Sequence, residues 1–183
     1  KKFNFVDNLE INKIDTPKKC LNIIISKSGN TLETVANFNS LGNKIDSIFL
    51  TENKKSYLTK IANKLKSEII EHNDFIGGRY SVLSETGMLP SLLMGLNIQK
   101  FKQLNNLIKK KNFVNNLIQN VGNILSFYKN NKSNSIILNY DEKSNDLFLW
   151  YQQLVAESLG KKSKGILPII SSMPRDNHSL MQL

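Results

Sequence analysis

The stretch Leu21-Asn-Ile-Ile-Ile-Ser-Lys-Ser-Gly-Asn-Thr-Leu-Glu-Thr34 contains the change of pattern that decides the fold. Its run of isoleucines at 23–25 is β-branched and continuous, which is typical of a buried strand. A short turn rich in hydroxyl groups follows at 26–31, and apolar residues then recur at helical spacing between Leu32 and Phe38. The stretch therefore predicts a strand, a tight turn and the start of a helix.

Two interpretations of this turn compete. The unpaired N–H groups of the first helical turn, together with the hydroxyls of Ser26, Ser28 and Thr31, could bind an anion. The same residues would serve equally well in an ordinary strand followed by a capped helix. Because ligands of parallel sheets collect at the carboxyl ends of the strands, where this turn would lie, its predicted location favours the anion site.

Strands and helices alternate along the first part of the chain. The segments 46–51 and 67–72 read as further strands, and Ser56 can cap a helix over 57–65 between them. This spacing predicts a parallel sheet covered by helices, an α/β fold. Smaller signals on either side of the first strand are an extended segment at 3–10, a turn at Thr16-Pro17 and a helix stop at Gly42.

The second part of the chain repeats the alternation after a long helical region. A loop at 75–81 sets paired glycines beside Arg79, and Pro90 suits the first turn of a helical region that runs to Tyr128 with breaks near Gly95 and Lys111. A polar break at 129–134 is the best domain boundary. The pattern then predicts a strand at 135–140, a helix from Ser144 or Asn145 to Gly160 and a strand at 164–170.

Composition limits the class of protein. The 183 residues are 40% hydrophobic and 22% charged, as in soluble globular proteins, and no apolar run has the length of a membrane span. A single cysteine, Cys20, excludes an internal disulfide framework and a cysteine-based metal cluster, and a reducing cytoplasm is the natural compartment. The net charge of +10 comes from scattered lysines without an aromatic-flanked basic motif, so we expect no nucleic-acid partner.

Two titratable residues, Glu157 and His178, are candidates for chemistry. Gln153 and Glu157 are four residues apart and therefore share one helix face, and Glu157 lies in the last helical turn, where a carboxylate suits a general base. The alternative is a solvated surface glutamate. His178 follows a predicted strand in a polar loop and is a second candidate, whereas His72 beside Glu71 reads as structural or exposed.

Four blocks together resemble phosphoglucose isomerases of the bacterial type, and they occur in the order of that family. They are Phe5-Val-Asp-Asn-Leu-Glu10 leading to Ser26-Lys-Ser-Gly-Asn-Thr-Leu-Glu-Thr34, then Gly77-Gly-Arg-Tyr-Ser81, then Gln152-Gln-Leu-Val-Ala-Glu-Ser-Leu-Gly-Lys161, and His178-Ser-Leu-Met-Gln-Leu183. The resemblance covers almost the whole chain. The segment Pro-Arg-Asp-Asn before His178 departs from the more usual Gly-Thr-Asn-Gly-Gln type.

The resemblance implies a role for each matched residue. Glu157 would be the base that moves a proton between C1 and C2 of the sugar through a cis-enediol. Arg79 would stabilise the enediolate, and His178 would assist ring opening from the partner subunit of a homodimer. The residues implied to hold the substrate are Ser26, Lys27, Ser28, Gly29, Asn30, Thr31, Gly78 and Gln153. No metal and no cofactor are implied.

The implied architecture is a pair of sugar-isomerase domains, each a three-layer α/β/α sandwich with a parallel sheet flanked by helices. We expect residues 1–128 to hold most of the first domain with connecting helices, and residues 129–183 to begin a second, incomplete domain. The implied activity is the interconversion of glucose 6-phosphate and fructose 6-phosphate. Two alternatives stay open: a sugar-phosphate-binding regulator without catalysis, and an isomerase for mannose 6-phosphate or an aminosugar phosphate.

Overall fold

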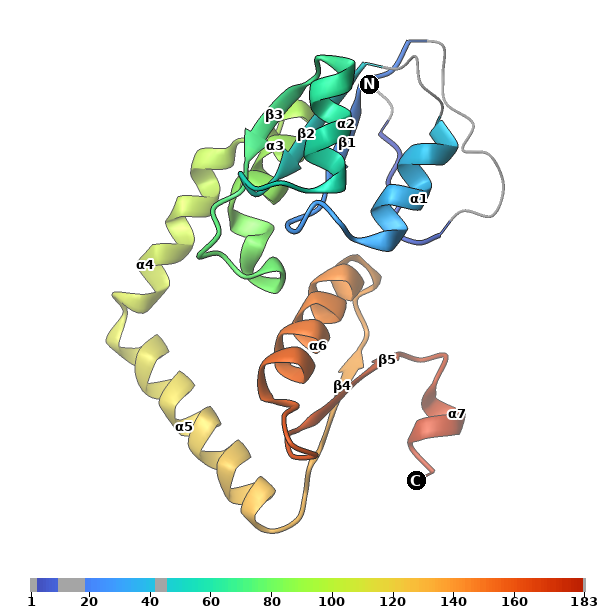
Figure 1. The fold of residues 1–183 in the computed structure, drawn as a ribbon. Coiled ribbons are helices and arrows are strands. Elements are labelled where there is room, and N and C mark those ends of the chain that lie inside the picture. Colours follow the sequence, from blue (N-terminus) through green and yellow to red (C-terminus); the bar gives the residue numbers. More distant parts are fainter. Residues whose placement is uncertain (1–2, 10–18, 42–45, 183) are drawn as a thin grey trace. The chain divides into compact units, whose positions relative to one another are not determined.

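The computed structural model describes residues 3–9, 19–41 and 46–182. The predicted turn at Thr16-Pro17, the helix stop at Gly42 and the end of the extended segment at Glu10 lie outside the described residues. Figure 1 shows the elements in chain order. The chain divides into two compact units, residues 1–98 and 99–183, and each is described by itself. The predicted boundary at 128/129 between sugar-isomerase domains stays a prediction.

The first unit is built on a three-stranded parallel sheet of order β1-β2-β3. Its elements are β1 (Asn22–Ile25), α1 (Leu32–Leu41), β2 (Ser47–Thr51), α2 (Tyr57–Leu65), β3 (Glu68–Glu71), a 3-10 turn (Gly78–Leu83) and α3 (Glu85–Leu93). All three predicted strands and the helix at 57–65 are confirmed. The segment from Phe3 to Leu9 contains no strand in the part that the structure describes.

The core of this unit lies between the sheet and its first two helices. Ile24 of β1 is the register partner of Phe49 of β2, and Phe38 of α1 meets the Phe49 ring edge-on with centroids 5.4 Å apart. Leu58 and Ala62 of α2 are fully buried in the same cluster. Burying each large apolar side chain stabilises the unit by about 1.5–3 kcal/mol, so this cluster holds the carboxyl ends of β1 and β2 in place.

Helix α2 begins where the sequence predicts. Ser56 accepts a hydrogen bond from the Thr59 amide at 3.2 Å, and the Ser56 amide donates to Thr59 Oγ1 at 2.9 Å. This reciprocal capping box satisfies two amides that would otherwise lack acceptors at the helix start. Before the helix, the Glu52 amide donates to the Lys27 carbonyl at 3.0 Å, which holds the loop that precedes α2 against the turn after β1.

Helix α3 begins earlier than its proline predicts. The prediction that Pro90 occupies a first turn is wrong, because the amide of Met88 already donates to the Ser84 carbonyl at 2.9 Å and the helix starts at Glu85. Pro90 therefore lies inside the helix. A proline inside a helix removes one main-chain donor, so proline is commoner in the first turn. A sequence pattern therefore places the start of the helix at the proline.

The second unit carries a two-stranded parallel sheet, β4-β5, with Ile136 opposite Ile169. Its elements are a 3-10 segment that starts at the unit boundary (Ile98–Leu104), α4 (Asn105–Ile108), α5 (Lys111–Lys129), β4 (Asn134–Asn139), a 3-10 turn (Glu142–Ser144), α6 (Asn145–Leu159), β5 (Leu167–Ser172) and α7 (Asn177–Leu180). Helix α6 packs on β5, and Gln152 donates to the Pro168 carbonyl at 2.9 Å. The α/β class with helices flanking parallel sheets is therefore confirmed.

Strand β5 begins three residues later than predicted. Lys164 pairs instead with Lys161 in a tight turn, and Gly165 adopts a φ of +134°. A side chain at Gly165 would contact the Leu159 carbonyl at 2.8 Å. Lys164 and Gly165, which the pattern assigned to the strand, therefore lie before it.

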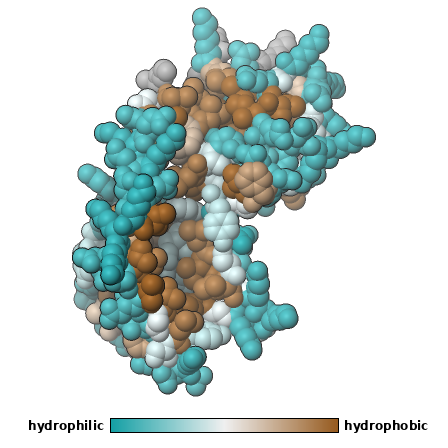
Figure 2. All heavy atoms as spheres, turned by 90° about the vertical axis from the view of Figure 1, so that its left-hand side faces the viewer, coloured by the Kyte–Doolittle hydropathy of each residue, from teal (hydrophilic) through white to brown (hydrophobic). Residues whose placement is uncertain are grey.

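Hydrophobic side chains also reach the surface, as the brown areas of the face drawn in Figure 2 show. Exposed apolar residues of α5 are Phe113, Leu117, Ile118, Val121, Ile124, Leu125 and Phe127. Among the residues that the structure describes, no helix combines the length and apolar character that a membrane crossing requires.

Candidate active site

Three hydroxyl groups converge in the turn after β1. Ser26 Oγ lies 2.8 Å from Thr31 Oγ1, and Ser28 Oγ lies 3.5 Å from the same atom. The Gly29 amide donates to Ser26 Oγ at 3.1 Å, and the Asn30 amide donates to Ser28 Oγ at 3.1 Å. The turn leads into α1, whose first amides have no acceptor within the helix. Hydroxyl and amide donors are thus gathered at one carboxyl strand end, where a phosphate could be held.

Gly29 makes this turn possible. It is buried with a φ of +65°, and a Cβ placed there would lie 2.2 Å from Ser56 Oγ and 2.9 Å from Thr51 Oγ1. The amide of Leu58 donates to the Gly29 carbonyl at 3.0 Å. The turn after β1 is therefore packed directly on the start of α2, and only a residue without a side chain fits between them.

The side chain of Asn30 also connects the turn after β1 to α2. Its Oδ1 accepts a hydrogen bond from the Tyr57 amide at 2.8 Å, at the first residue of α2. An acceptor at that place satisfies one of the amides that the helix itself leaves without a partner. The amide oxygen of Asn30 thus joins the turn to a neighbouring helix.

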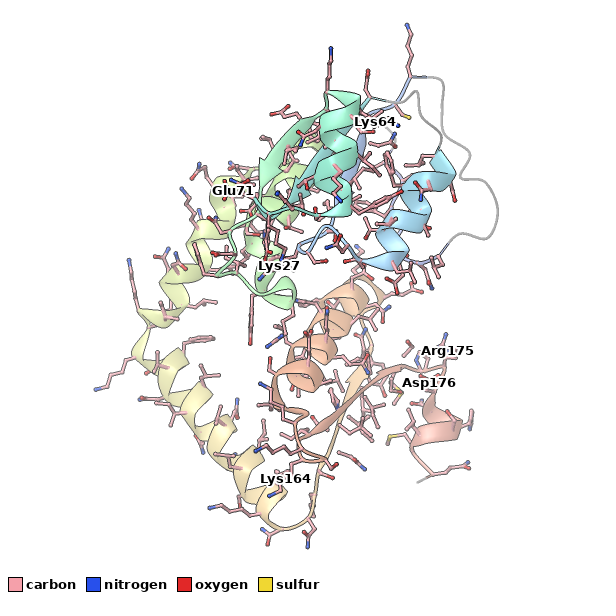
Figure 3. All side chains as sticks on the ribbon, in the orientation of Figure 1. Lys27, Lys64, Glu71, Lys164, Arg175 and Asp176 are labelled. Carbon is pink, nitrogen blue, oxygen red and sulfur yellow. The ribbon has the colours of Figure 1, made fainter. Side chains whose placement is uncertain are left out.

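The ammonium group of Lys27 reaches a different loop. It donates to the carbonyls of Asp74 at 2.9 Å and Ile76 at 2.7 Å, and it lies 3.4 Å from a carboxylate oxygen of Glu52. Lys27 is labelled in Figure 3. Lys54 also pairs with Glu52, and its hydrogen bond, with that of Lys27, lowers the pKa of this carboxyl below its ordinary value. Lys27 therefore ties the turn after β1 to the segment that precedes Gly77-Gly78-Arg79.

Arg79 lies in the 3-10 turn that follows the paired glycines. Its guanidinium sits over the Tyr80 ring, 4.9 Å from the ring centroid, and the residue is half-buried. Gly78 is exposed, and a Cβ there would meet nothing within 4 Å. The Ser81 hydroxyl donates to the Gly78 carbonyl at 2.7 Å, which closes the turn.

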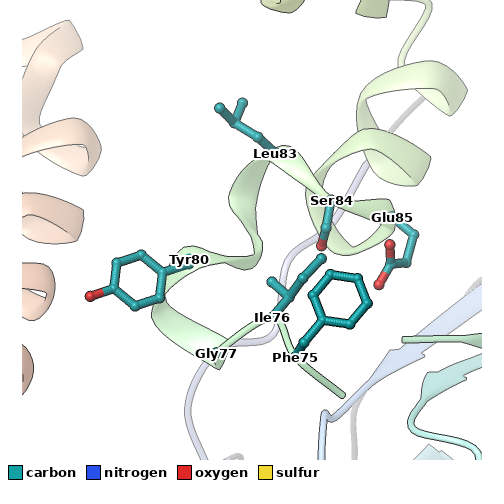
Figure 4. A pocket seen from close by; sticks show the side chains of 7 residues that line it. All are labelled: Phe75, Ile76, Gly77, Tyr80, Leu83, Ser84 and Glu85. Atoms are coloured by element: carbon teal, nitrogen blue, oxygen red, sulfur yellow. The ribbon is translucent and has the colours of Figure 1, made fainter. Parts of the chain in front are cut away.

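An open hollow of about 460 Å³ adjoins this turn. Its lining residues, drawn in Figure 4, are Phe75, Ile76, Gly77, Tyr80, Leu83, Ser84 and Glu85. Phe75 and Glu85 lie close together in that view, and the Tyr80 ring points away from them. Most of these side chains are apolar, so the hollow itself offers little to a sugar phosphate.

The second unit places Gln153 and Glu157 together on one exposed face of α6. Gln153 Nε2 lies 3.5 Å from Glu157 Oε2. The predicted sharing of a helix face is therefore confirmed. An exposed carboxylate beside an amide can take up a proton while the amide binds a neighbouring hydroxyl group.

The loop after β5 is organised by Asp176. Its carboxylate accepts from the Ser172 amide at 2.8 Å, from Ser171 Oγ at 3.3 Å and from Arg175 Nε at 3.0 Å. Figure 3 labels Arg175 and Asp176 at this loop. His178 follows in the short helix α7 and is exposed. The Asp176 carboxylate therefore shapes the loop that leads from β5 to His178.

Asp176 gives a prediction on acid stability. The hydrogen bond from Arg175 and, to a smaller extent, that from the Ser172 amide lower the pKa of Asp176 below its ordinary value of 3.8. A lowered folded-state pKa stabilises the fold above the unfolded pKa, and the contribution is lost as the pH falls below about 4. Asp176→Asn should therefore be less stable than wild type at pH 7 and approach it in acid, as measured by urea unfolding across pH. The exposed Glu68→Gln is the control, and an equal difference at all pH values would contradict the prediction.

The structure pairs His72 with Glu85, a contact that the sequence did not predict. His72 is buried with 1% of its surface exposed; its Nδ1 pairs with the Glu85 carboxylate, and its Nε2 lies 3.2 Å from the Ile76 carbonyl. Of the two interpretations of His72, structural or exposed, the structure therefore confirms the first, and the carboxylate that pairs with the ring belongs to Glu85. Glu85 follows in a different element, and no spacing rule connects it to His72.

Comparison with known proteins identifies the family. The family model described as phosphoglucose isomerase matches residues 4–167. The chain is similar to glucose-6-phosphate isomerase of Methanocaldococcus jannaschii (32% identity, 98% of this chain, 49% of the relative) and of Fusobacterium nucleatum (35% identity, 87% of this chain, 39% of the relative). It thus spans half or less of the length of these relatives.

A solved structure supports the fold independently. A crystal structure of a hypothetical protein from Thermus thermophilus superposes with a TM-score of 0.73 at 24% identity, over 93% of this chain and 45% of that one. At this identity the likeness concerns the fold. The family model covers most of the sequence, so the chain belongs to the phosphoglucose isomerase family.

Proposed function

We propose that the protein containing this chain is an aldose–ketose isomerase that interconverts glucose 6-phosphate and fructose 6-phosphate. The hydroxyls of Ser26, Ser28 and Thr31, with the amides at the start of α1, hold the phosphate. Arg79, Gln153, Glu157 and His178 act on the sugar. The family membership and the names of the relatives support this substrate pair.

The reaction is a proton transfer within the sugar. After ring opening, assisted by His178, Glu157 removes the proton from C2 of the aldose; the electron pair of that C–H bond forms the C1–C2 double bond, and the carbonyl pair moves onto O1 to give the cis-enediolate. The proton of the O2 hydroxyl passes to O1, and when Glu157 returns its proton to C1 a carbonyl remains at C2, so that one proton has moved from C2 to C1 and one from O2 to O1. The guanidinium of Arg79 offsets the negative charge that develops on the enediolate oxygens, and Gln153 binds a sugar hydroxyl.

One observation carries the proposal furthest. The hydroxyl turn and the Gly77-Gly78-Arg79 segment come from different parts of the sequence, and Lys27 joins them through the carbonyls of Asp74 and Ile76. A phosphate held at the turn would therefore be bound at a place that is fixed relative to the loop carrying Arg79. Such anchoring supplies binding energy for orienting the reacting carbons.

The subunit arrangement is part of the same proposal. We expect a cytoplasmic homodimer in which His178 reaches the site of the partner subunit, since the resemblance implies this arrangement. Mixing Glu157→Gln and His178→Ala subunits should then restore activity, because a mixed dimer contains one intact site. An inactive mixture that has exchanged subunits would contradict an exchange of His178.

The activity itself is tested with the whole protein. Fructose 6-phosphate should yield glucose 6-phosphate in an assay coupled to glucose-6-phosphate dehydrogenase, without added metal. Mannose 6-phosphate and glucosamine 6-phosphate are the parallel substrates. Faster turnover of either would reassign the substrate, and binding of fructose 6-phosphate without turnover would indicate a regulator.

A further inference from the structure

His72 connects both ends of the segment that carries Arg79. Its Nε2 lies 3.2 Å from the carbonyl of Ile76, immediately before Gly77-Gly78-Arg79. Its Nδ1 pairs with the carboxylate of Glu85, which begins α3 immediately after the 3-10 turn. One buried imidazole thus holds the entry and the exit of the turn in which Arg79 lies.

The strand that leads to His72 is itself well fixed. The His72 amide donates to the Thr51 carbonyl at 2.9 Å, which continues the pairing of β3 with β2. The side chain is enclosed, since only 1% of the residue is exposed. The ring is therefore a rigid point at the end of the sheet, and the Arg79 segment is attached to it through two hydrogen bonds.

The Ile76 carbonyl receives two donors. Lys27 Nζ donates to it at 2.7 Å from the turn after β1, and His72 Nε2 approaches from the end of β3. The Ile76 carbonyl and the Glu85 carboxylate are both acceptors, so the ring binds both when each of its nitrogens carries a hydrogen. Lys27 of the turn after β1 and His72 at the end of β3 therefore share the Ile76 carbonyl, which immediately precedes the Arg79 segment.

Glu85 completes the arrangement. With Nε2 committed to the carbonyl, Nδ1 needs its own partner, and the Glu85 carboxylate supplies it. The Asn73 amide lies 3.4 Å from the same carboxylate oxygen. Without Glu85, a buried ring nitrogen would lose its carboxylate partner, and the ring would be free to turn away from Ile76.

We propose that His72 and Glu85 are positioning residues, which hold Arg79 in register with the phosphate-binding turn. The inference rests on the proposed function, because it assigns to Arg79 the enediolate that the isomerase forms. Neither residue touches the substrate. Their effect on the reaction passes through the Ile76 carbonyl and the Glu85 end of the 3-10 turn.

The test uses the whole protein and fructose 6-phosphate in the coupled assay. Glu85→Ala should lower kcat by about 10- to 100-fold, the scale of loss for a displaced catalytic group, while KM stays within about threefold. In an Arg79→Gln background the same change should alter kcat by less than about twofold, because the group that it displaces is already gone. Glu71→Ala, an exposed carboxylate one residue before His72, is the matched control.

The outcomes separate the two proposals. An inactive wild-type protein would refute the proposed function, whereas an active protein in which Glu85→Ala behaves like Glu71→Ala would refute only the positioning role. Equal losses of kcat with and without Arg79 would also refute it, since they indicate a general structural effect. If Glu85→Ala does not fold, Glu85→Asp withdraws the carboxylate by one methylene; a wild-type kcat in that variant would overturn the inference.

Discussion

Replacing Glu157 with Gln should lower kcat for fructose 6-phosphate by about 10² to 10⁴, the contribution of a general acid–base group. The amide keeps the size of the side chain and its place near Gln153 on the exposed face of α6. It cannot accept the proton from C2. Because the proposed phosphate site is the turn after β1, in a different part of the chain, KM should stay within about threefold. The measurement is the coupled assay on the whole protein.

A matched variant controls for the loss of a surface charge. Glu142 is also exposed and lies in the 3-10 turn before α6, so Glu142→Gln should leave kcat unchanged. Exchange of the C2 proton with deuterium from solvent gives a second readout, and Glu157→Gln should slow it together with turnover. Wild-type turnover or exchange in Glu157→Gln would show that another group is the base.

Gly29→Ala should have the largest effect on stability. A non-glycine residue at a φ of +65° is strained, and the new Cβ would lie 2.2 Å from Ser56 Oγ. Backbone strain and overpacking each cost about 1–3 kcal/mol, so we expect the free energy of unfolding to fall by about 2–4 kcal/mol. KM for fructose 6-phosphate should rise as well, since the hydroxyls of the turn are displaced. Urea unfolding and the coupled assay measure the two effects.

Two variants make the cause of this loss specific. Gly122 lies inside α5, and a Cβ there meets nothing within 4 Å, so Gly122→Ala should leave stability unchanged or raise it. Ser56→Gly removes the atoms nearest to the new Cβ and should recover part of the loss in the Gly29→Ala protein. Wild-type stability in Gly29→Ala would contradict the tight packing of this turn on α2.

Local sequence signals predicted most of the elements correctly. The isoleucine run predicted β1, because continuous β-branched residues fit a strand that is covered by helices. Ser56 marked the start of α2, because a hydroxyl followed by Thr59 can exchange hydrogen bonds with the first amides. Both structures depend on residues that are close in the sequence, so they can be predicted without knowledge of the tertiary contacts.

The two wrong boundaries have physical causes. Pro90 reads as a helix start, but α3 begins at Glu85, where the Met88 amide donates to the Ser84 carbonyl. Pro90 therefore lies inside the helix. The pattern from 164 to 170 reads as strand, but Lys164 pairs with Lys161 across a tight turn, and Gly165 directly after it has a φ of +134°. Proline is tolerated inside a helix as well as at its start, and glycine occurs in turns as well as in strands, so neither residue by itself decides the boundary.

By itself the sequence determined the α/β class, the phosphoglucose isomerase family and the hydroxyl groups of the turn after β1, because motif order and short-range spacing carry that information. Only the tertiary structure decided what holds this turn in place. Lys27 binds carbonyls 47 and 49 residues away, and His72 pairs with a glutamate 13 residues away. Every residue has a main-chain carbonyl, so no pattern marks the ones that a side chain will reach, and only folding selects them.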